Sequence, residues 1–306
     1  MGAIAVTGGT GFVGRHLVRT LLARGHSVRV LARDLSRLPF PADAVQVVRG
    51  ALADDAALDR LAAGADALVH LVGIIAETAD VTFEGIHVEG TRRAVAAATR
   101  GGVGRLVHMS AVGARHEASA TPYHRTKAGG EDVVRAAGLP FVILRPAVIV
   151  GPESAPIAIL ARLHRWLPAV PVFGAGDFPM QPVWIGDVTT AFALAAEGVP
   201  AQGVHELGGP AHVTYVDFVR AVGRAAGRPR PVVHVPLTLA RVAASAFDFL
   251  PAALAPITTD QLQMLVEGGA TPDNAIERVF GIEPLGLDEA LRRALERDER
   301  RGTGDG

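Results

Sequence analysis

The first half of the chain alternates between short apolar runs and longer segments in which apolar residues recur every three or four positions. The short runs lack a regular alternation of polar and apolar residues, which is typical of parallel strands covered by helices on both faces. Strands are therefore predicted at Ala3–Thr7, Ser27–Ala32, Val45–Val48, Ala67–Leu71, Leu106–Ser110 and Phe141–Leu144, with helices between them. This order predicts an α/β protein with a doubly wound parallel sheet and right-handed crossovers.

The first predicted helix runs from about Gly11 to Arg24. Its apolar residues form a stripe that can pack against a sheet, namely Phe12, Val13, Leu17, Val18, Leu21 and Leu22. Gly25 stands just past its end, where glycine is favoured because the backbone often enters the left-handed region there. We expect the helix to stop at this point.

Prolines become frequent from Gly151 onward, at positions 152, 156, 168, 171, 179 and 182. We expect residues 1–150 to form the main domain, completed by parts of 183–210. Residues 151–306 are expected to form a smaller, mostly helical lobe that meets a substrate or a partner. Further predicted elements are a strand at Val204–Leu207 that returns to the sheet and helices at Tyr215–Ala226 and Leu287–Arg300.

One segment of this lobe, residues 237–250, has two interpretations. Its apolar residues can line one helix face, namely Leu239, Val242, Ala243, Phe247 and Leu250. Such stripes usually pack in a core, and we favour that interpretation. The alternative is a face that docks a partner or rests on a membrane surface.

Composition limits the partners and the chemistry. The 306 residues include 30 basic and 31 acidic side chains, a net charge of −1, so there is no basic excess to hold a nucleic acid. The absence of cysteine excludes disulfides, thiolate zinc sites and iron–sulfur clusters. The 11 histidines are scattered, without a spacing typical of metal ligands, so no metal site is predicted.

No segment predicts export or insertion into a membrane. The first predicted strand begins at Ala3, without a basic region or a cleavage site before it. The longest apolar region, Val232–Ile257, contains Arg241, Asp248 and three prolines, so it does not offer the roughly 20 apolar residues that a spanning helix needs. We expect a cytoplasmic protein.

A glycine-rich loop follows the first strand, with Gly8, Gly11 and Gly14 at spacings of three. In such loops the first glycine permits a tight turn, the second lets the backbone approach a pyrophosphate, and the third lets the helix lie close to the sheet. The helix N-terminus then presents free N–H groups to the anion. The loop predicts a dinucleotide site in a Rossmann domain; the alternative is a glycine turn that binds nothing.

The residues after the second strand bear on the choice of cofactor. An acidic residue there favours NAD(H), because it bonds the ribose 2′-hydroxyl, whereas an arginine favours the 2′-phosphate of NADP(H). This chain has Ala32 followed by Arg33, with Ser36 and Arg37 nearby. NADP(H) is therefore favoured. NAD(H) is the alternative, with Arg33 a solvated loop residue and Asp34 on the ribose.

The chain has 29 arginines but one lysine, Lys127, which stands four positions after Tyr123, one of only two tyrosines. Four residues are one helical turn, so the two side chains share a face of a helix. A lysine retained in so arginine-rich a chain suggests a place where a compact ammonium is needed. The alternative is an ordinary exposed pair on a helix.

These motifs together resemble the extended branch of the short-chain dehydrogenase/reductase superfamily, whose members include epimerases and dehydratases. The resemblance rests on the glycine loop, Ser110 and the Tyr123–Lys127 pair. Later segments support it: Arg145-Pro146, Val150-Gly151-Pro152, the run 183–188 and the run 206–210. Within the branch, the runs 87–91, 108–113 and 181–184 are most similar to the nucleotide-binding accessory subunit of respiratory complex I and its bacterial relatives.

The resemblance implies roles for individual residues. Tyr123 would be the general acid or base, Lys127 would make its phenolate accessible and bond the nicotinamide ribose, and Ser110 would bond the reacting oxygen. A nearby cation is the expected way to lower the pKa of a tyrosine. The implied cofactor-binding residues are Gly8, Thr10, Gly11, Phe12, Val13, Gly14, Arg33, Leu52, Val72, Gly73, Lys127 and Pro146.

Four positions depart from the pattern of the superfamily. His87 stands where an asparagine often supports a proton relay, and Ala51 where an aspartate commonly holds the adenine. Epimerases of the branch usually carry an arginine where this chain has Phe178-Pro179-Met180-Gln181, and a second Ser or Thr where it has Ala111. Both departures remove polar groups that a nucleotide-sugar substrate would need, which argues against an epimerase. The first two departures weaken the case for turnover without removing it.

Two classes of function remain open. The protein is either an oxidoreductase that acts on a small hydroxyl or carbonyl substrate, or a dinucleotide-binding accessory or assembly factor of respiratory complex I. The second class would add complex I subunits as partners and a peripheral position on the inner membrane face.

Overall fold

A seven-stranded, fully parallel sheet forms the centre of the first of two compact units. The computed structural model describes residues 1–35, 38–41, 43–200, 202–247 and 258–302. The first unit comprises Met1–Pro146, Gly186–Leu207 and Asp273–Ile282. The second comprises Ala147–Ile185, Gly208–Pro272 and Glu283–Gly306.

The strand order of the sheet is β3-β2-β1-β4-β5-β6-β11. The strands are β1 (Ala3–Thr7), β2 (Ser27–Ala32), β3 (Gln46–Arg49), β4 (Ala67–His70), β5 (Arg105–Met109), β6 (Phe141–Pro146) and β11 (Gly203–Leu207). The order reverses between β1 and β4, and in such sheets the ligand crevice lies beyond the carboxyl ends of the strands at that reversal. The predicted fold class is confirmed. The first two strands have the predicted bounds, and the ends of the others differ from prediction by one or two residues.

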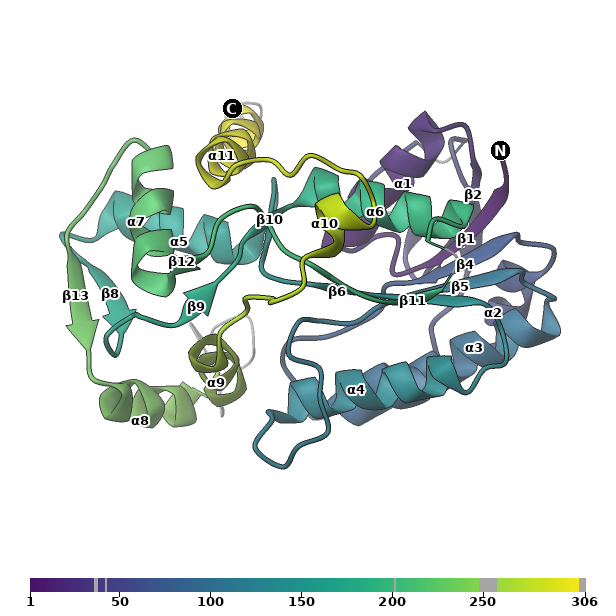
Figure 1. Cartoon of the computed structure of the whole chain (residues 1–306), viewed down its shortest axis with the longest axis horizontal. Coiled ribbons are helices and arrows are strands. Elements are labelled where there is room, and N and C mark those ends of the chain that lie inside the picture. The colour runs from purple at the N-terminus through teal and green to yellow at the C-terminus, as the bar shows by residue number, and fades with distance from the viewer. Residues whose placement is uncertain (36–37, 42, 201, 248–257, 303–306) are drawn as a thin grey trace. The chain divides into compact units, whose positions relative to one another are not determined.

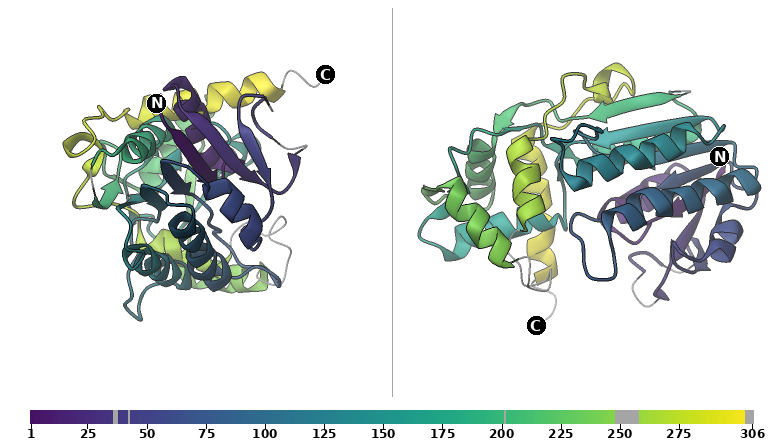
Figure 2. Two further views of the ribbon diagram at one scale, coloured as in Figure 1. Left: turned by 90° about the vertical axis from the view of Figure 1, so that its right-hand side faces the viewer. Right: turned by 90° about the horizontal axis from the view of Figure 1, so that it is seen from below.

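Helices cover both faces of the sheet (Figure 1). One face carries α2 (Asp55–Ala62), α3 (Gly90–Arg100) and α4 (Pro122–Arg135), and the other carries α1 (Phe12–Ala23) and α6 (Ile185–Glu197). A short helix, α10 (Ala275–Arg278), packs by β11. Figure 2 shows α3 and α4 lying side by side. The apolar core under these helices includes Leu58, Leu61, Leu68, Leu106 and Ile143, all fully buried.

The first helix ends where the sequence predicted. Gly25 follows the C-cap residue Arg24 and has a φ of 82°, a left-handed conformation that glycine adopts without strain. On the outer face, α1 is tied to α6 by the hydroxyls of Thr20 and Thr189, 3.1 Å apart, and by an ion pair of 2.6 Å between Arg24 and Glu197.

The second unit is built from helices and short strand pairs. Its helices are α5 (Ala155–Trp166), α7 (Tyr215–Ala225), α8 (Leu237–Phe247), α9 (Thr259–Glu267) and α11 (Leu287–Gly302). Its strands pair as β8 (Val170–Phe173) with β13 (Val232–Val235), β7 (Ile149–Val150) with β10 (Val183–Trp184), and β9 (Pro179–Met180) with β12 (Val213–Thr214). The core joins α5, α7 and α11 through Ile157, Phe218, Val219 and Leu291.

The favoured interpretation of residues 237–250 as lobe core is wrong for the exposed side of α8. Leu239 is 61% exposed and Val242 is 68% exposed. The buried side of this helix carries Ala240 and Ala244, which pack with Leu262 of α9. The small alanines allow the helices to approach closely and turn the larger residues outward. The Phe247 side chain and Leu250 lie outside the described residues.

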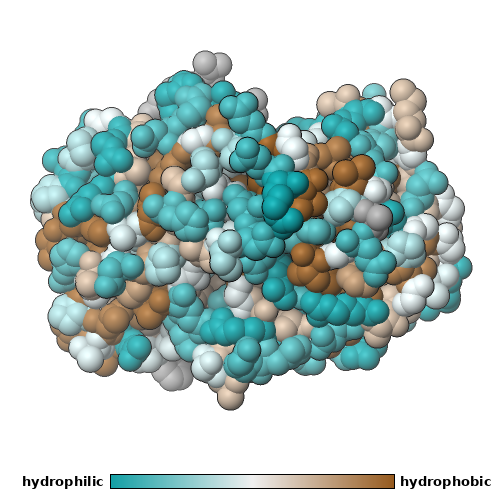
Figure 3. Space-filling view, in the orientation of Figure 1, coloured by the Kyte–Doolittle hydropathy of each residue, from teal (hydrophilic) through white to brown (hydrophobic). Residues whose placement is uncertain are grey.

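The visible surface mixes hydrophilic residues with scattered hydrophobic ones (Figure 3). Among the helices that the structure describes, none has both the length and the apolar character needed to cross a bilayer.

Two buried histidines stack on each other within the sheet. His70 of β4 and His108 of β5 are register partners, with ring centroids 5.5 Å apart and planes at 17°. Both nitrogens of His70 meet threonine hydroxyls, Thr7 at 2.7 Å and Thr91 at 3.2 Å. Neither nitrogen of His108 has a partner among the described residues. Burial, and then the charge of Lys127, lowers the pKa of His70 to about 3 and that of His108 well below its usual value.

We expect His108→Leu to be at least as stable as the wild type at neutral pH, because it removes two buried polar atoms without partners. The wild-type free energy of unfolding should fall as the pH drops below about 6.5, because the unfolded chain then binds protons that the folded His108 resists. In His108→Leu this fall should be shallower by up to about 1.4 kcal/mol per pH unit.

Urea unfolding from neutral to acidic pH measures both effects. His108→Gln is the control, since it keeps a buried polar side chain and should be less stable than His108→Leu. A large loss of stability in His108→Leu at neutral pH would show that the ring nitrogens have partners after all.

Candidate active site

The glycine loop between β1 and α1 has the geometry of a phosphate cradle. Gly8 has a φ of 74°, and the N–H of Gly11 donates to its carbonyl over 3.0 Å, closing a tight turn. A Cβ on Gly14 would lie 2.1 Å from the oxygen of Gly8, so only glycine lets α1 lie this close to β1. A Cβ on Gly11 would meet one atom within 4 Å, the Gly8 oxygen at 3.2 Å. The backbone at Gly11 is therefore open to a ligand.

The N-terminus of α1 is free to receive an anion. Its N-cap residue is Gly11, no side chain caps the first turn, and that turn carries no acidic residue. The first N–H groups, on Phe12, Val13 and Gly14, therefore lack a capping acceptor. Arg15, which sequence reasoning missed, donates to the carbonyls of Thr10 and Gly11 over 3.2 and 3.3 Å and adds positive charge here. These residues fit a dinucleotide pyrophosphate.

The other predicted cofactor residues follow the carboxyl ends of neighbouring strands. Arg33 follows β2 and is exposed, and Ser36 and Arg37 lie outside the described residues. Leu52 follows β3 and packs against Gly90, where a Cβ would come within 2.4 Å of it. The predicted residues at the ends of β4 and β6 are Val72, Gly73 and Pro146.

Lys127 lies on α4 and is 2% exposed. Its ammonium donates to the carbonyl of Met109 at the end of β5. A Cβ on Gly73 would come within 3.9 Å of the ammonium, so the end of β4 lies beside it. Burial lowers the pKa of Lys127 to about 8, and Glu131, one helical turn later, opposes that shift. The structure therefore brings Lys127 to the edge of the sheet where the glycine loop lies.

Tyr123 lies one turn before Lys127 with its ring partly buried. The ring packs edge-on against His87 and Phe83, with centroids 5.4 and 5.9 Å apart. Burial raises the pKa of Tyr123 to about 12. This shift is opposite to the lowering expected from Lys127, because removal of the ring from water penalises the phenolate. Tyr123 is consequently protonated at neutral pH, which suits a proton donor.

Ser110 directly follows β5 and is 2% exposed. Its hydroxyl makes no hydrogen bond of regular geometry to any described residue, although it lies close enough to Glu131 to help lower the pKa of that carboxyl. A buried hydroxyl of this kind has hydrogen-bonding capacity left for a ligand.

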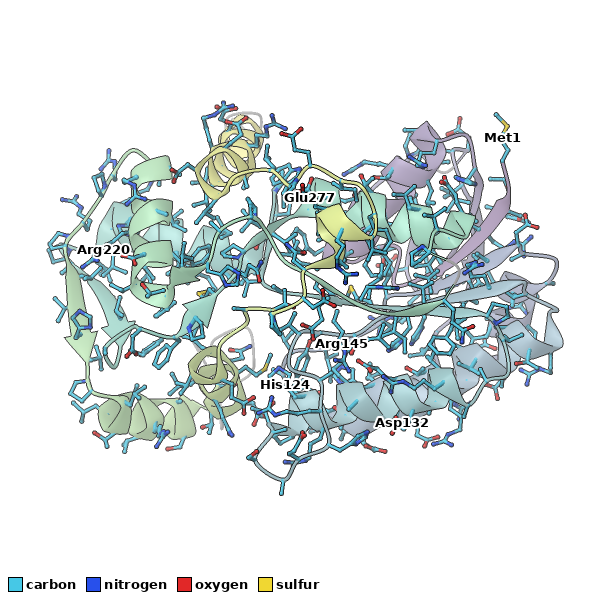
Figure 4. The ribbon with its side chains drawn as sticks, in the orientation of Figure 1. Met1, His124, Asp132, Arg145, Arg220 and Glu277 are labelled. Atoms are coloured by element: carbon cyan, nitrogen blue, oxygen red, sulfur yellow. The ribbon has the colours of Figure 1, made fainter. Side chains whose placement is uncertain are left out.

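Glu131 lies beside the site on α4 and is bound by two arginines. Its fully buried carboxylate accepts two hydrogen bonds of 2.7 Å from Arg145 and one of 2.6 Å from Arg135. Burial raises the pKa of Glu131, but the bonds and charges of the arginines lower it overall. Arg145 reaches from β6 toward α4 (Figure 4) and also meets Glu206 of β11 at 3.4 Å. Sequence reasoning missed this network, although Glu131 stands one helical turn after Lys127.

His87 occupies a π-helical segment, Glu84–Glu89, that leads into α3. Its Nε2 accepts from the N–H of Ile74 over 3.1 Å, so the proton sits on Nδ1, which lies 2.9 Å from the hydroxyl of Thr126. Burial and then the charge of Lys127 lower the pKa of His87 to about 3. His87 is thus a neutral imidazole with both nitrogens engaged.

Among the described residues, no three His, Asp or Glu side chains are placed to hold a metal ion together.

Comparisons with known proteins identify the family. The model of the NAD dependent epimerase/dehydratase family matches residues 4–208. The ceramide reductase of Caulobacter vibrioides is 41% identical over 172 residues, which are 56% of this chain and 54% of that protein. The chain thus matches only about half the length of that relative.

Two further proteins cover more of the chain. The mitochondrial NADH dehydrogenase [ubiquinone] 1 alpha subcomplex subunit 9 of Arabidopsis thaliana is 29% identical over 299 residues, covering 89% of this chain and 71% of that protein. The Bordetella bronchiseptica enzyme WbmH, solved in complex with NAD+, shares the fold with a TM-score of 0.75 at 21% identity, covering 99% of each chain.

The family match runs from β1 through β11 and includes the glycine loop, Ser110, Tyr123 and Lys127. It therefore spans every element that builds the site described above. The chain belongs to the NAD-dependent epimerase/dehydratase family.

Proposed function

We propose that the protein is an NAD(P)-dependent oxidoreductase that reduces a carbonyl group on a lipid-like substrate. The observation that carries the proposal is the set of Tyr123, Lys127 and Ser110 at the edge of the sheet that also holds the glycine cradle. A protonated tyrosine, a buried ammonium and a hydroxyl without a regular partner are the groups that carbonyl reduction needs.

The cofactor would lie across the carboxyl ends of β1, β2 and β4. The loop Gly8–Gly14 and the N-terminus of α1 would hold its pyrophosphate, with Thr10, Phe12 and Val13 as neighbours. Leu52, Val72, Gly73 and Pro146 would line its path, and Lys127 would bond the ribose beside the nicotinamide. When bound, the nicotinamide supplies the hydride.

Side chains of the protein would supply the proton. The hydroxyl of Tyr123 would protonate the carbonyl oxygen, while Ser110 donates a hydrogen bond to the same oxygen. The phenolate left on Tyr123 would be stabilised by the ammonium of Lys127, which is mostly charged at neutral pH because its pKa is about 8. His87 would stay neutral and hold the end of β4 through Ile74.

The substrate class follows from two considerations. The name of the ceramide reductase indicates that this relative acts on a lipid. A nucleotide-sugar substrate is less compatible with Gln181, because this side chain is buried and already bonds Gly209 and Thr271 over 2.8 and 2.9 Å. Its polar ends are therefore engaged within the protein.

Tyr123→Phe should lower kcat/KM for the NADPH-dependent reduction of long-chain ketones by about 10² to 10⁴, because it removes the proton donor. Dinucleotide affinity, measured by thermal shift, should stay within about twofold, since the phenylalanine keeps the packing with His87 and Phe83. The control is Tyr215→Phe, which changes the other tyrosine. Turnover at the wild-type rate in Tyr123→Phe would rule out the assigned role.

We further propose that NADP(H) is preferred over NAD(H). The support is Arg33, which is exposed directly after β2, where a 2′-phosphate is commonly held. Arg33→Ser should weaken NADPH binding about tenfold or more and leave NADH binding unchanged, because a charge-assisted bond to the phosphate is lost. Titration with each dinucleotide measures this, and an equal loss for both would overturn the preference.

A second candidate function is a dinucleotide-holding accessory or assembly factor of respiratory complex I, peripheral to the inner membrane face. The similarity to the Arabidopsis subunit over 89% of the chain favours it. In that case the protein should co-purify with complex I subunits from solubilised membranes, and Tyr123→Phe should leave complex assembly intact. Recovery solely in the soluble fraction, with NADPH-dependent turnover, would favour the reductase.

A further inference from the structure

The C-terminal end of α5 presents a cluster of exposed basic and apolar residues. We call it the Trp166 patch and define it as Arg162, Arg165, Trp166, Leu167, Arg230 and Val233. Trp166 is 75% exposed, Val233 is 54% exposed and Leu167 is 36% exposed. A tryptophan this exposed on a soluble protein usually belongs to a binding surface.

The second unit holds these residues together through regular structure. β13 runs parallel to β8, the strand that follows α5 in the chain (Figure 1). Its register sets Val233 opposite Pro171. The N–H of Arg230 donates to Nδ1 of the buried His164 over 3.3 Å, and its guanidinium donates to the His164 carbonyl over the same distance. The Trp166 patch is therefore a feature of the folded unit, although its members come from two distant parts of the sequence.

The patch carries three arginines and no acidic residue. α5 carries no acidic residue along its twelve positions. Within the described part of the chain, no ion pair involves Arg162, Arg165 or Arg230, whereas arginines elsewhere are paired, such as Arg92 with Glu89 and Arg93 with Asp55. Three guanidinium groups beside an open indole are complementary to a surface that is anionic outside and apolar within.

We propose that the Trp166 patch docks the protein onto an anionic lipid bilayer. The arginines would pair with headgroup phosphates, for which the planar guanidinium is well suited. Trp166 would lie at the headgroup level, where indoles concentrate, and Leu167 and Val233 would reach the acyl boundary. This proposal goes beyond the reductase function and does not depend on it.

A bilayer fits the dimensions of the patch better than a protein partner does. Three exposed apolar side chains fall short of the roughly 800 Å² per partner that a stable protein interface buries. Membrane binding needs less apolar area, because each basic residue near an anionic surface adds about 1 kcal/mol. That increment corresponds to about a fivefold change in partitioning.

The test is co-sedimentation of the full-length protein with vesicles of phosphatidylcholine alone or of phosphatidylcholine mixed with phosphatidylglycerol. Wild type should bind the anionic vesicles and not the neutral ones, with binding weakened by salt. The double variant Arg162→Gln/Arg165→Gln should partition about 30-fold less. Trp166→Ser should also reduce binding.

Two control variants isolate the patch. Arg92→Gln/Arg93→Gln removes the same net charge from α3 and should bind as wild type does. Leu239→Ser/Val242→Ser removes the exposed apolar face of α8 and should have no effect. Thermal unfolding of each variant checks folding. If a patch variant unfolds, the fluorescence of Trp166 is measured instead in Trp184→Phe, which keeps the patch intact. Insertion of the indole into the bilayer should shift its emission to the blue.

Several outcomes would overturn the proposal. These are absence of wild-type binding to anionic vesicles, equal binding to neutral ones, unchanged binding in both patch variants, or loss of binding in the α8 variant. A fall in oligomer mass in Trp166→Ser, measured by sedimentation equilibrium, would assign the patch to contact between copies instead.

Discussion

Burying the ammonium of Lys127 removes a charge from water, and the surrounding groups must offset that cost. The carbonyl of Met109 accepts from the ammonium, and Glu131 supplies a compensating charge one helical turn away. Glu131 is itself fully buried, so it requires Arg145 and Arg135 in turn. The same positive charge helps keep His70, His87 and His108 neutral. The buried cation thus adds to the effect of burial in keeping these three histidines neutral.

The pattern of the sequence predicts the sheet well because each strand is a local apolar run that ends at a turn. It predicts the glycine loop for the same reason, since the turn and the close approach of α1 depend on Gly8 and Gly14 within one short segment. The Glu131–Arg145 pair was not predicted, because it forms only when α4 packs against β6. The raised pKa of Tyr123 depends likewise on packing against Phe83 and His87, which the spacing to Lys127 does not reveal.

The exposed face of α8 shows a second limit of prediction from the sequence. Apolar residues at helical spacing predict a stripe, but they do not predict which side of the helix packs when small residues occupy the opposite side. Ala240 and Ala244 provide that contact, and the larger Leu239 and Val242 face water. The two candidate functions would use the same dinucleotide cradle. They differ in whether the proton of Tyr123 is used and in whether the protein has complex I subunits as partners.

The solitary lysine has a practical consequence for handling the protein. Reagents that acylate amines, such as activated esters and many crosslinkers, react with an accessible, uncharged amine. In the folded chain the only side-chain amine is 2% exposed and held by a backbone carbonyl. Acylation of Lys127 would therefore report an opening of the site rather than a surface label. The rate of this modification, followed by mass spectrometry, gives a direct measure of how often α4 separates from the end of β5.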